Sequence, residues 1–370
     1  MPLLIRNRIE RRNARLVHQQ IKEMLRASIE RGEMRSGEML PGRLELCRLF
    51  GANRLSVDRA VTDLVKEGWL IAVKGKGTFV AGPPSAESAA VSAPTLTLGV
   101  VWSVSHVSDE NHYWGPLLRG ISYEAGERNI RLLFRQLPLD GYGDFFRTAG
   151  VEGLIVLASR VREEAALQGL RQAGIPFVAT SSAYDDQSLP CVATDNAAGV
   201  RQVLEHLWGL GHRAIGMVVP NLSSTDDLRR WEAYQTLMGE AGLVIDPRWV
   251  LLAPERESVR WEERLRGWLE SMPLPTAIFA AEYKTALLVW KVLRERGVAV
   301  PGAVSLVGFD DPTSAELLEL PLTTVRQRTE VLGRRAVEKL CEALAKGVIA
   351  EGTELLMPEL IVRQTTAPCR

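Results

Sequence analysis

Several features that mark specialised proteins are scarce in this chain. Only four cysteines occur among 370 residues, and no two have the CxxC spacing of a metal or redox motif; they are Cys47, Cys191, Cys341 and Cys369. The five histidines are scattered as widely, so the sequence predicts no metal site. We expect the cysteines to be reduced and to pack as small apolar side chains.

Long apolar runs are missing as well. Three apolar residues at 3–5 precede arginines at positions 6, 8, 11 and 12, whereas a signal peptide has its charges first and then about 7–15 apolar residues. No segment approaches the roughly 20 apolar residues that span a bilayer. We therefore expect a cytoplasmic protein with no membrane partner.

The sequence also lacks the motifs of common enzymes. GxSxG, HExxH and the phosphate-binding P-loop are absent. A pyridoxal-phosphate enzyme would need a Schiff-base lysine, but lysines are few beyond residue 95 and each falls in an expected helix: Lys284, Lys291, Lys339 and Lys346. We expect a protein that is not an enzyme, with no catalytic residues and no cofactor.

The net charge is zero, but the charges are distributed unevenly. The first 82 residues hold 16 Lys plus Arg against 9 Asp plus Glu, which leaves 29 basic and 36 acidic residues in the rest. A basic first fifth joined to an acidic remainder indicates one module that meets phosphate and one that does not. Between them, residues 83–95 are small side chains bracketed by prolines, which is typical of a linker.

The residues before the linker, 12–82, have the pattern of a winged helix-turn-helix. Apolar residues at helical spacing between 17 and 29 predict a first helix, and a short second helix ends at Gly51. Asn53 can cap a third helix over 54–66. Two short strands then enclose a basic glycine hairpin at 74–77.

Two elements of this module carry candidate DNA contacts. A helix-turn-helix inserts its second helix into the major groove, and the wing lies along the backbone or in the minor groove. Each basic residue alone would be interpreted as a solvated surface charge. The third helix and the hairpin are expected to face the same DNA duplex, however, so the set together indicates DNA contacts. The candidates are Arg54, Ser56, Arg59, Lys74, Gly75, Lys76 and Gly77.

Three segments, residues 40–46, 53–60 and 75–80, closely resemble the GntR type of winged helix and occur in the same order. The resemblance adds Arg43 and Thr78 to the candidate DNA contacts. The family usually carries arginine where Leu44 stands and often where Asp58 stands, with an acidic residue at the place of Arg43. The operator sequence of the family therefore cannot be carried over.

Beyond the linker, apolar strands alternate with amphipathic helices, which predicts parallel sheets covered on both faces. The 275 residues from 96 to 370 exceed one comfortable sheet domain, so we expect two α/β lobes with a cleft between them. The expected strands include residues 96–102, 130–134, 153–158, 176–179, 214–219, 277–280 and 305–309.

This region resembles the sensor domain of the LacI/GalR family, which is similar to periplasmic sugar-binding proteins. The resemblance implies a multidomain α/β fold, in which the winged helix-turn-helix precedes a two-lobed, type I periplasmic-binding-protein-like domain for effector binding and dimerisation. A GntR-type head on this sensor resembles the arrangement of arabinose-operon repressors. The segments that carry the resemblance are 117–121, 194–199, 210–216, 307–311, 321–325 and 332–336.

The resemblance implies a ligand between the lobes, at the carboxyl ends of strands. Polyols need paired hydrogen bonds from charged planar groups and an aromatic face. Arg230 and Asp310 match cleft positions of the family, Tyr113 and Trp114 take the places of an aromatic pair, and Ser103 follows the first strand. Alternatively, Arg230 and Asp310 form a structural ion pair and Trp114 is helix core.

Two pairs depart from the family at places that help define the sugar. Glu282 and Tyr283 replace the usual Asn-Asp, and Ser181 and Ser182 replace a frequent Asp-Arg. Ser181, Glu282 and Tyr283 remain candidate ligand contacts, but the ligand need not be a common hexose. Residues 195–196 are expected to cap the following helix rather than to touch ligand.

These observations predict a ligand-responsive DNA-binding transcription regulator. We expect a homodimer that binds a double-stranded DNA operator and represses carbohydrate-utilisation genes until a small, sugar-like effector releases it. The alternative is a DNA-binding regulator whose sensor has lost or radically changed its ligand control. A transport binding protein would conflict with the DNA-binding head.

Overall fold

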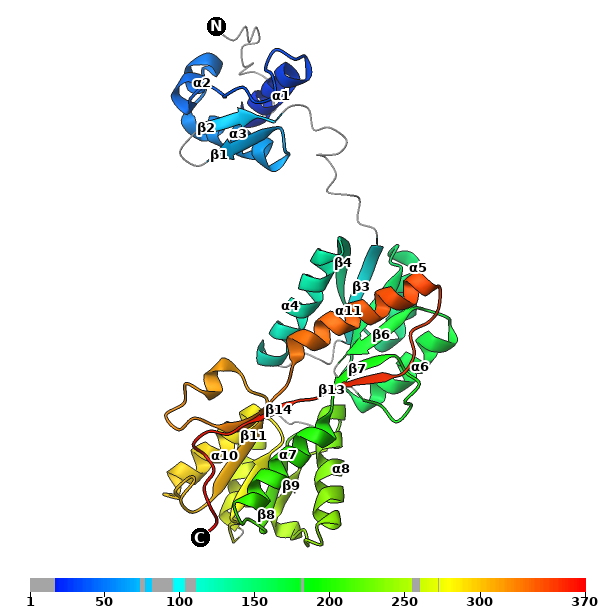
Figure 1. Cartoon of the computed structure of the whole chain (residues 1–370), viewed down its shortest axis with the longest axis vertical. Coiled ribbons are helices and arrows are strands. Elements are labelled where there is room, and N and C mark those ends of the chain that lie inside the picture. Colours follow the sequence, from blue (N-terminus) through cyan, green and yellow to red (C-terminus); the bar gives the residue numbers. More distant parts are fainter. Residues whose placement is uncertain are drawn as a thin grey trace. The chain divides into compact units, whose positions relative to one another are not determined.

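A computed structural model of the chain shows two compact units, Met1–Pro94 and Thr95–Arg370 (Figure 1). It describes residues 17–73, 77–81, 96–103, 111–180, 183–254, 260–271 and 273–370. None of the helices within these ranges is long and apolar enough to cross a membrane. Four of the candidate site residues lie outside the described residues: Lys74, Gly75, Lys76 and Ser181.

The first unit has three helices and a two-stranded hairpin that share one apolar core. The hairpin strands are antiparallel, with Leu70 opposite Val80. This order of elements confirms the predicted winged helix-turn-helix. The elements are α1 (Val17–Glu30), α2 (Arg43–Phe50), α3 (Arg54–Lys66), β1 (Leu70–Val73) and β2 (Gly77–Val80).

The ends of α2 and α3 follow the signals in the sequence. The C-cap of α2 is Gly51, whose φ of +59° lies in the left-handed region that glycine adopts without steric cost. The N-cap of α3 is Asn53, whose side-chain oxygen accepts a hydrogen bond from the backbone N–H of Ser56 at 2.9 Å. The tight connection between these caps fixes the start of α3 relative to α2.

The second unit contains two lobes, and the sheet of lobe 1 has the order β13-β7-β6-β5-β3-β4 with parallel pairing throughout. Helices α4 and α11 cover one face of this sheet, and α5 and α6 cover the other. The elements are β3 (Leu96–Ser103), α4 (Asn111–Glu127), β4 (Ile130–Leu137), α5 (Tyr142–Thr148), β5 (Gly153–Leu157), α6 (Glu164–Gln172), β6 (Phe177–Thr180), β7 (Cys191–Thr194), α11 (Thr329–Lys346) and β13 (Thr353–Leu356).

The sheet of lobe 2 has the order β14-β12-β11-β10-β8-β9, and β14 is its one antiparallel strand among the described residues. Helices α7 and α8 cover one face, and α9 and α10 cover the other. The elements are α7 (Asn196–Gly209), β8 (Ile215–Val219), α8 (Thr225–Glu240), β9 (Val250–Leu252), α9 (Trp261–Ser271), β10 (Ala277–Ala280), α10 (Tyr283–Glu295), β11 (Ser305–Phe309), β12 (Thr323–Arg326) and β14 (Glu359–Ile361).

The chain passes between the two lobes three times, as Figure 1 shows. It leaves lobe 1 after β7, returns from β12 into α11, and leaves again between β13 and β14. Helices α4 and α11 lie side by side in lobe 1. The predicted two-lobed architecture is therefore confirmed, and residues near the crossings can contact both lobes.

Candidate DNA-binding and effector sites

Helix α3 has one buried and one exposed face. Its buried residues recur at helical spacing and belong to the core of the first unit: Val57, Ala60, Val61 and Leu64. The opposite face includes Arg54, whose side chain is 73% exposed, and Arg59, which is also exposed. Two of the predicted DNA contacts therefore lie on the solvent face of the predicted recognition helix.

The carboxylate of Asp58 links two candidate DNA contacts from different helices. Arg43, at the start of α2, donates a hydrogen bond from Nε to Asp58 Oδ1 at 2.9 Å. Arg54 lies one helical turn before Asp58, with its Nε 3.6 Å from Oδ2. Arg43 and Asp58 stand where the GntR pattern has an acidic residue and often an arginine. The two positions form an ion pair here with the charges exchanged between α2 and α3.

The remaining candidates of the first unit differ in their surroundings. Ser56 is half-buried, and its backbone N–H is taken by the Asn53 cap. Thr78 is also half-buried, and its carbonyl accepts a hydrogen bond from the Leu40 N–H at 2.7 Å. Gly77 has a φ of +125°, a conformation suited to glycine at the base of the hairpin tip.

A cavity of about 320 Å³ lies between the two lobes of the second unit. The start of α4 supplies one wall, and the segment that follows β11 supplies another. Tyr113 and Asp310, both predicted ligand contacts, line it together. The other lining residues are Gly115, Pro116, Arg119, Asp311, Pro312, Thr313, Gln327 and Thr329.

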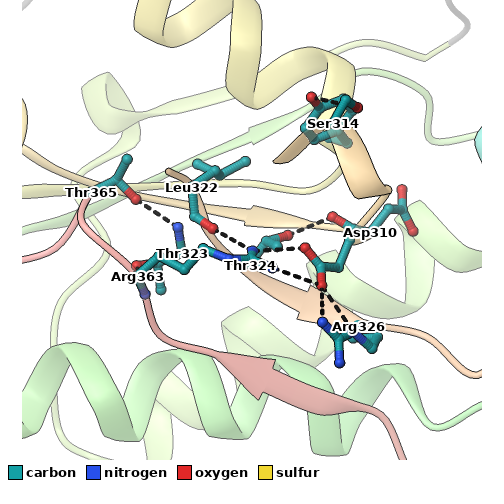
Figure 2. A network of polar contacts seen from close by, with 10 residues as sticks. Asp310, Ser314, Leu322, Thr323, Thr324, Arg326, Arg363 and Thr365 are labelled. Atoms are coloured by element: carbon teal, nitrogen blue, oxygen red, sulfur yellow. Dashed lines mark hydrogen bonds and ion pairs between the residues drawn. The ribbon is translucent and has the colours of Figure 1, made fainter. Parts of the chain in front are cut away.

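Asp310 is held in an uncommon backbone conformation in the cavity wall. Its φ of +71° lies in the left-handed region, which residues other than glycine rarely adopt. The Thr324 hydroxyl donates to its carbonyl oxygen at 2.6 Å (Figure 2), and the Gln327 side-chain amide donates to its carboxylate. Gln327 also accepts a hydrogen bond from the Thr194 hydroxyl at 2.5 Å. Its side-chain amide therefore links Thr194 of lobe 1 to Asp310 of lobe 2.

Arg230 on α8 is almost completely buried, with 3% of its surface exposed. Its Nε donates to Asn196 Oδ1 at 2.8 Å, and its Nη1 donates to the Ala281 carbonyl at 2.7 Å. The guanidinium carbon lies 3.7 Å from the ring centre of Phe309, the residue before Asp310. None of the described residues accepts a hydrogen bond from Nη2, but Arg230 is almost fully buried and is not among the residues that line the cavity.

The charge of Arg230 is balanced by several carboxylates. Burial lowers the pKa of Arg230, but the carboxylates of Asp310, Asp226 and Asp227 outweigh it, and the net shift is upward. Arg230 forms an ion pair with Asp227, whose Oδ1 lies 3.6 Å from Nη1. Asp310 acts on Arg230 through the electrostatic field, and its carboxylate accepts from Gln327.

The remaining predicted ligand contacts that fall within the described residues do not line this cavity either. Trp114 forms a separate apolar pocket of about 190 Å³ with Trp102, and its ring meets that of Tyr113 edge to face at 5.4 Å. Tyr283 packs in the core of lobe 2, and its hydroxyl donates to Ser314 at 3.0 Å. Glu282 accepts a hydrogen bond from Thr285, and Ser103 is buried at the end of β3.

Sequence reasoning missed three side chains of this region. Asp195 is the predicted cap of α7 and accepts from the Ala198 N–H, but the expectation for Asn196 is wrong, because its amide joins Arg230 to Asp226. The apolar run at 305–309 predicts only a strand position for Phe309, and no sequence pattern indicates a role for Gln327. The one sequence signal for a role of Phe309 is its position next to Asp310, which matches a cleft position of the LacI/GalR family.

The lobes also contact each other away from this cavity. The Val161 N–H donates to the Ser223 carbonyl and the Thr225 N–H donates to the Ser159 carbonyl, each at 3.0 Å. Arg229 on α8 donates to the Ala183 carbonyl at 3.1 Å. Any change in the angle between the lobes must therefore rearrange a defined set of polar contacts.

A winged helix-turn-helix joined to a two-lobed sheet domain defines a DNA-binding transcription regulator with a sensor. Residues 17–80 match the family of bacterial regulatory proteins described as the gntR family, and residues 204–366 match a periplasmic binding protein-like domain. The chain therefore joins a gntR-type DNA-binding head to a periplasmic binding protein-like sensor domain, and its sensor domain is similar to those of LacI-family regulators.

The similar proteins are regulators. The arabinose metabolism transcriptional repressor of Geobacillus stearothermophilus is 29% identical over 364 residues, which cover 94% of this chain and 96% of that protein. The transcriptional regulator CelR of Thermobifida fusca is 27% identical over 86% of this chain and 96% of its own length. A LacI-family regulatory protein from Chloroflexus aggregans has a solved structure with 29% identity and a TM-score of 0.64, over 73% of this chain and 98% of that one.

Proposed function

We propose that this protein is a homodimeric repressor of carbohydrate-utilisation genes that a small, sugar-like effector releases from operator DNA. The observation that supports the effector class best is the setting of Arg230. Its buried guanidinium lies on the ring of Phe309, and the next residue, Asp310, lines the interlobe cavity. Vicinal hydroxyl groups can accept from the guanidinium and donate to the carboxylate at once.

The related proteins support a sugar-type effector. The relative from Geobacillus stearothermophilus is a repressor of arabinose metabolism, and a solved LacI-family structure from Enterococcus faecium contains ribose. Tyr113 in the cavity wall offers this chain an aromatic face for the apolar side of a sugar ring. The cavity volume of about 320 Å³ suits a small ligand.

The DNA-binding role rests on the exposed face of α3 and on the wing. We propose that Arg43, Arg54, Ser56, Arg59, Gly77 and Thr78 contact the operator together with the hairpin tip at 74–76. Arg54→Ala should weaken operator binding by about 1–3 kcal/mol if this side chain reads a base. One winged helix covers one half-site, so a dimer through residues 96–370 would read a palindrome.

We propose that binding of the effector relieves repression. An effector shifts an equilibrium only through its different affinity for the two states. Because the cavity has walls from both lobes, a ligand there favours one interlobe angle over others. A change in the interlobe angle of a dimer would alter the spacing of its two DNA-binding heads. The heads would then fit the two half-sites of the operator less well.

A ligand screen on the full-length protein tests the effector assignment. Thermal unfolding would be followed with a panel of pentoses, hexoses and disaccharides that includes arabinose, ribose and cellobiose. We expect at least one sugar to raise the midpoint for the wild type but not for Arg230→Gln or Asp310→Asn. Arg294→Gln is a matched control, because Arg294 forms an exposed ion pair with Glu319.

The second candidate is a regulator whose sensor no longer responds to a sugar. The position of Tyr283 favours it, since this side chain packs into the lobe 2 core where the family pattern has a polar residue of the cleft. If no sugar in the panel shifts the wild-type midpoint while the protein still selects a DNA sequence, this candidate replaces the first.

A further inference from the structure

Leu55 is the most exposed of the large apolar side chains on the helices of the first unit. It is the second residue of α3, and 78% of its surface is accessible. The apolar residues of α3 that stabilise the unit lie on the other face, from Val57 to Leu64. Leu55 therefore contributes nothing to the core, and its exposure calls for another explanation.

The neighbours of Leu55 give this face a positive charge. Arg54 and Arg59 are exposed beside it on the same side of α3. Asp58 draws Arg54 along the helix, with 3.6 Å between their charged atoms, and neither side chain covers Leu55. An apolar group between two cations matches the edge of a base pair flanked by phosphates.

We propose that Leu55 contacts the C5-methyl group of a thymine in each operator half-site. The inference rests on the proposed DNA-binding function of α3. Residues in the first turn of a recognition helix meet base edges in the major groove. Leucine can neither donate nor accept a hydrogen bond, and the thymine methyl is the apolar group that the major groove presents. Leu55 thus specifies thymine beside the base that Arg54 reads.

The experiment removes one methyl group at a time from the DNA. Full-length protein first selects duplexes from a random library, and each thymine of the selected half-site is then replaced by deoxyuridine, which lacks only the C5-methyl. We expect one position at which this replacement weakens wild-type binding about fourfold, the effect of exposing one buried methyl group. All other thymines should tolerate the change.

Two variants connect this methyl group to Leu55. Leu55→Ala should bind the thymine and deoxyuridine duplexes equally at the sensitive position. Leu49→Ala is the matched control, because Leu49 is an exposed leucine on α2, 44% accessible, and its loss should leave the fourfold difference intact. Both changes replace exposed residues in helices, so neither removes core packing.

The outcomes separate the inference from the function on which it rests. If the library yields no preferred sequence, the DNA-binding function fails and the inference falls with it. If a sequence is selected but the wild type tolerates every deoxyuridine, the inference alone is overturned. The same holds if Leu55→Ala keeps the full sensitivity of the wild type.

Discussion

Arg363 and Asp311 form a two-point ion pair at the candidate effector site, whose wall includes Asp311. Nη1 of Arg363 lies 2.7 Å from one carboxylate oxygen of Asp311, and Nη2 lies 3.1 Å from the other. Arg326 donates to the second oxygen at 2.9 Å, and the Asp311 side chain is only 2% exposed. Asp311 is thus held by two arginines next to Asp310, which has a left-handed backbone conformation and also lines the cavity.

This network should be costly to break. Asp311→Ala leaves two arginines without their buried carboxylate, and we expect the unfolding free energy of the sensor unit to fall by about 3–5 kcal/mol. Urea denaturation measures the change. The control is Glu319→Gln, which removes an exposed partner of Arg294 and should have little effect. Equal stability of the Asp311 and Glu319 variants would contradict the structural role of the network.

The crossing of α4 and α11 depends on two glycines. A Cβ on Gly120 would lie 2.0 Å from the Glu330 carbonyl oxygen, and one on Gly333 would lie 2.2 Å from that of Leu117. Gly333→Ala should therefore destabilise the protein by about 1–3 kcal/mol or more, because backbone must move to admit the methyl group. Thermal and urea unfolding would both show the loss.

Gly126 supplies the matched control on the same helix. Nothing lies within 4 Å of a Cβ at this position, and Gly126 is in the last turn of α4. Gly126→Ala should stabilise the protein by about 0.5–1 kcal/mol through helix propensity. A Gly333→Ala variant as stable as the wild type would show that the two helices do not cross as closely as described.

The two histidines of lobe 2 predict acid sensitivity. Burial lowers the pKa of both His206 and His212 below the usual 6.5, and the buried Nδ1 of His212 has no hydrogen-bond partner among the described residues. The unfolded chain then binds more protons than the folded one, so stability falls as pH drops below about 6.5. Replacing both residues with glutamine should flatten the change in unfolding free energy between pH 7.5 and 5.5. A slope identical to that of the wild type would contradict this assignment.

Strong local patterns predicted much of the fold. The bounds of α3, β10 and β11 agree with those expected from capping and apolar runs, because each forms part of a core. β12 gave no such signal, since its buried residues include Thr323 and Thr324. Their hydroxyls are satisfied by partners distant in sequence, and no local pattern reveals that.

The candidate effector site was predictable only in part. Arg230 and Asp310 were found through a family resemblance, not through spacing, because they are 80 positions apart in sequence. Asn196 looked like a helix cap since Asp195 and Asn196 are equally suited to capping by composition. Which of the two caps the helix and which bonds to Arg230 depends on tertiary packing.

Asp58 should control the balance between specific and general DNA binding. Asp58→Asn removes a negative charge from the exposed face of α3 and releases Arg43 and Arg54 from their shared carboxylate. We expect tighter binding to unrelated DNA and a smaller ratio of specific to general affinity. Titrations against selected and scrambled duplexes at two salt concentrations measure both quantities. An unchanged ratio would show that the carboxylate does not position these arginines for readout.

The proposed switch requires that a ligand in the interlobe cavity control the DNA-binding head. Fluorescence anisotropy of a labelled, selected operator, titrated with full-length protein in the presence and absence of the sugar found by thermal screening, tests it most directly. We expect the sugar to release DNA from the wild type, whereas Arg230→Gln should bind DNA with unchanged affinity and should not be released. Equal release of both proteins by the sugar would contradict it.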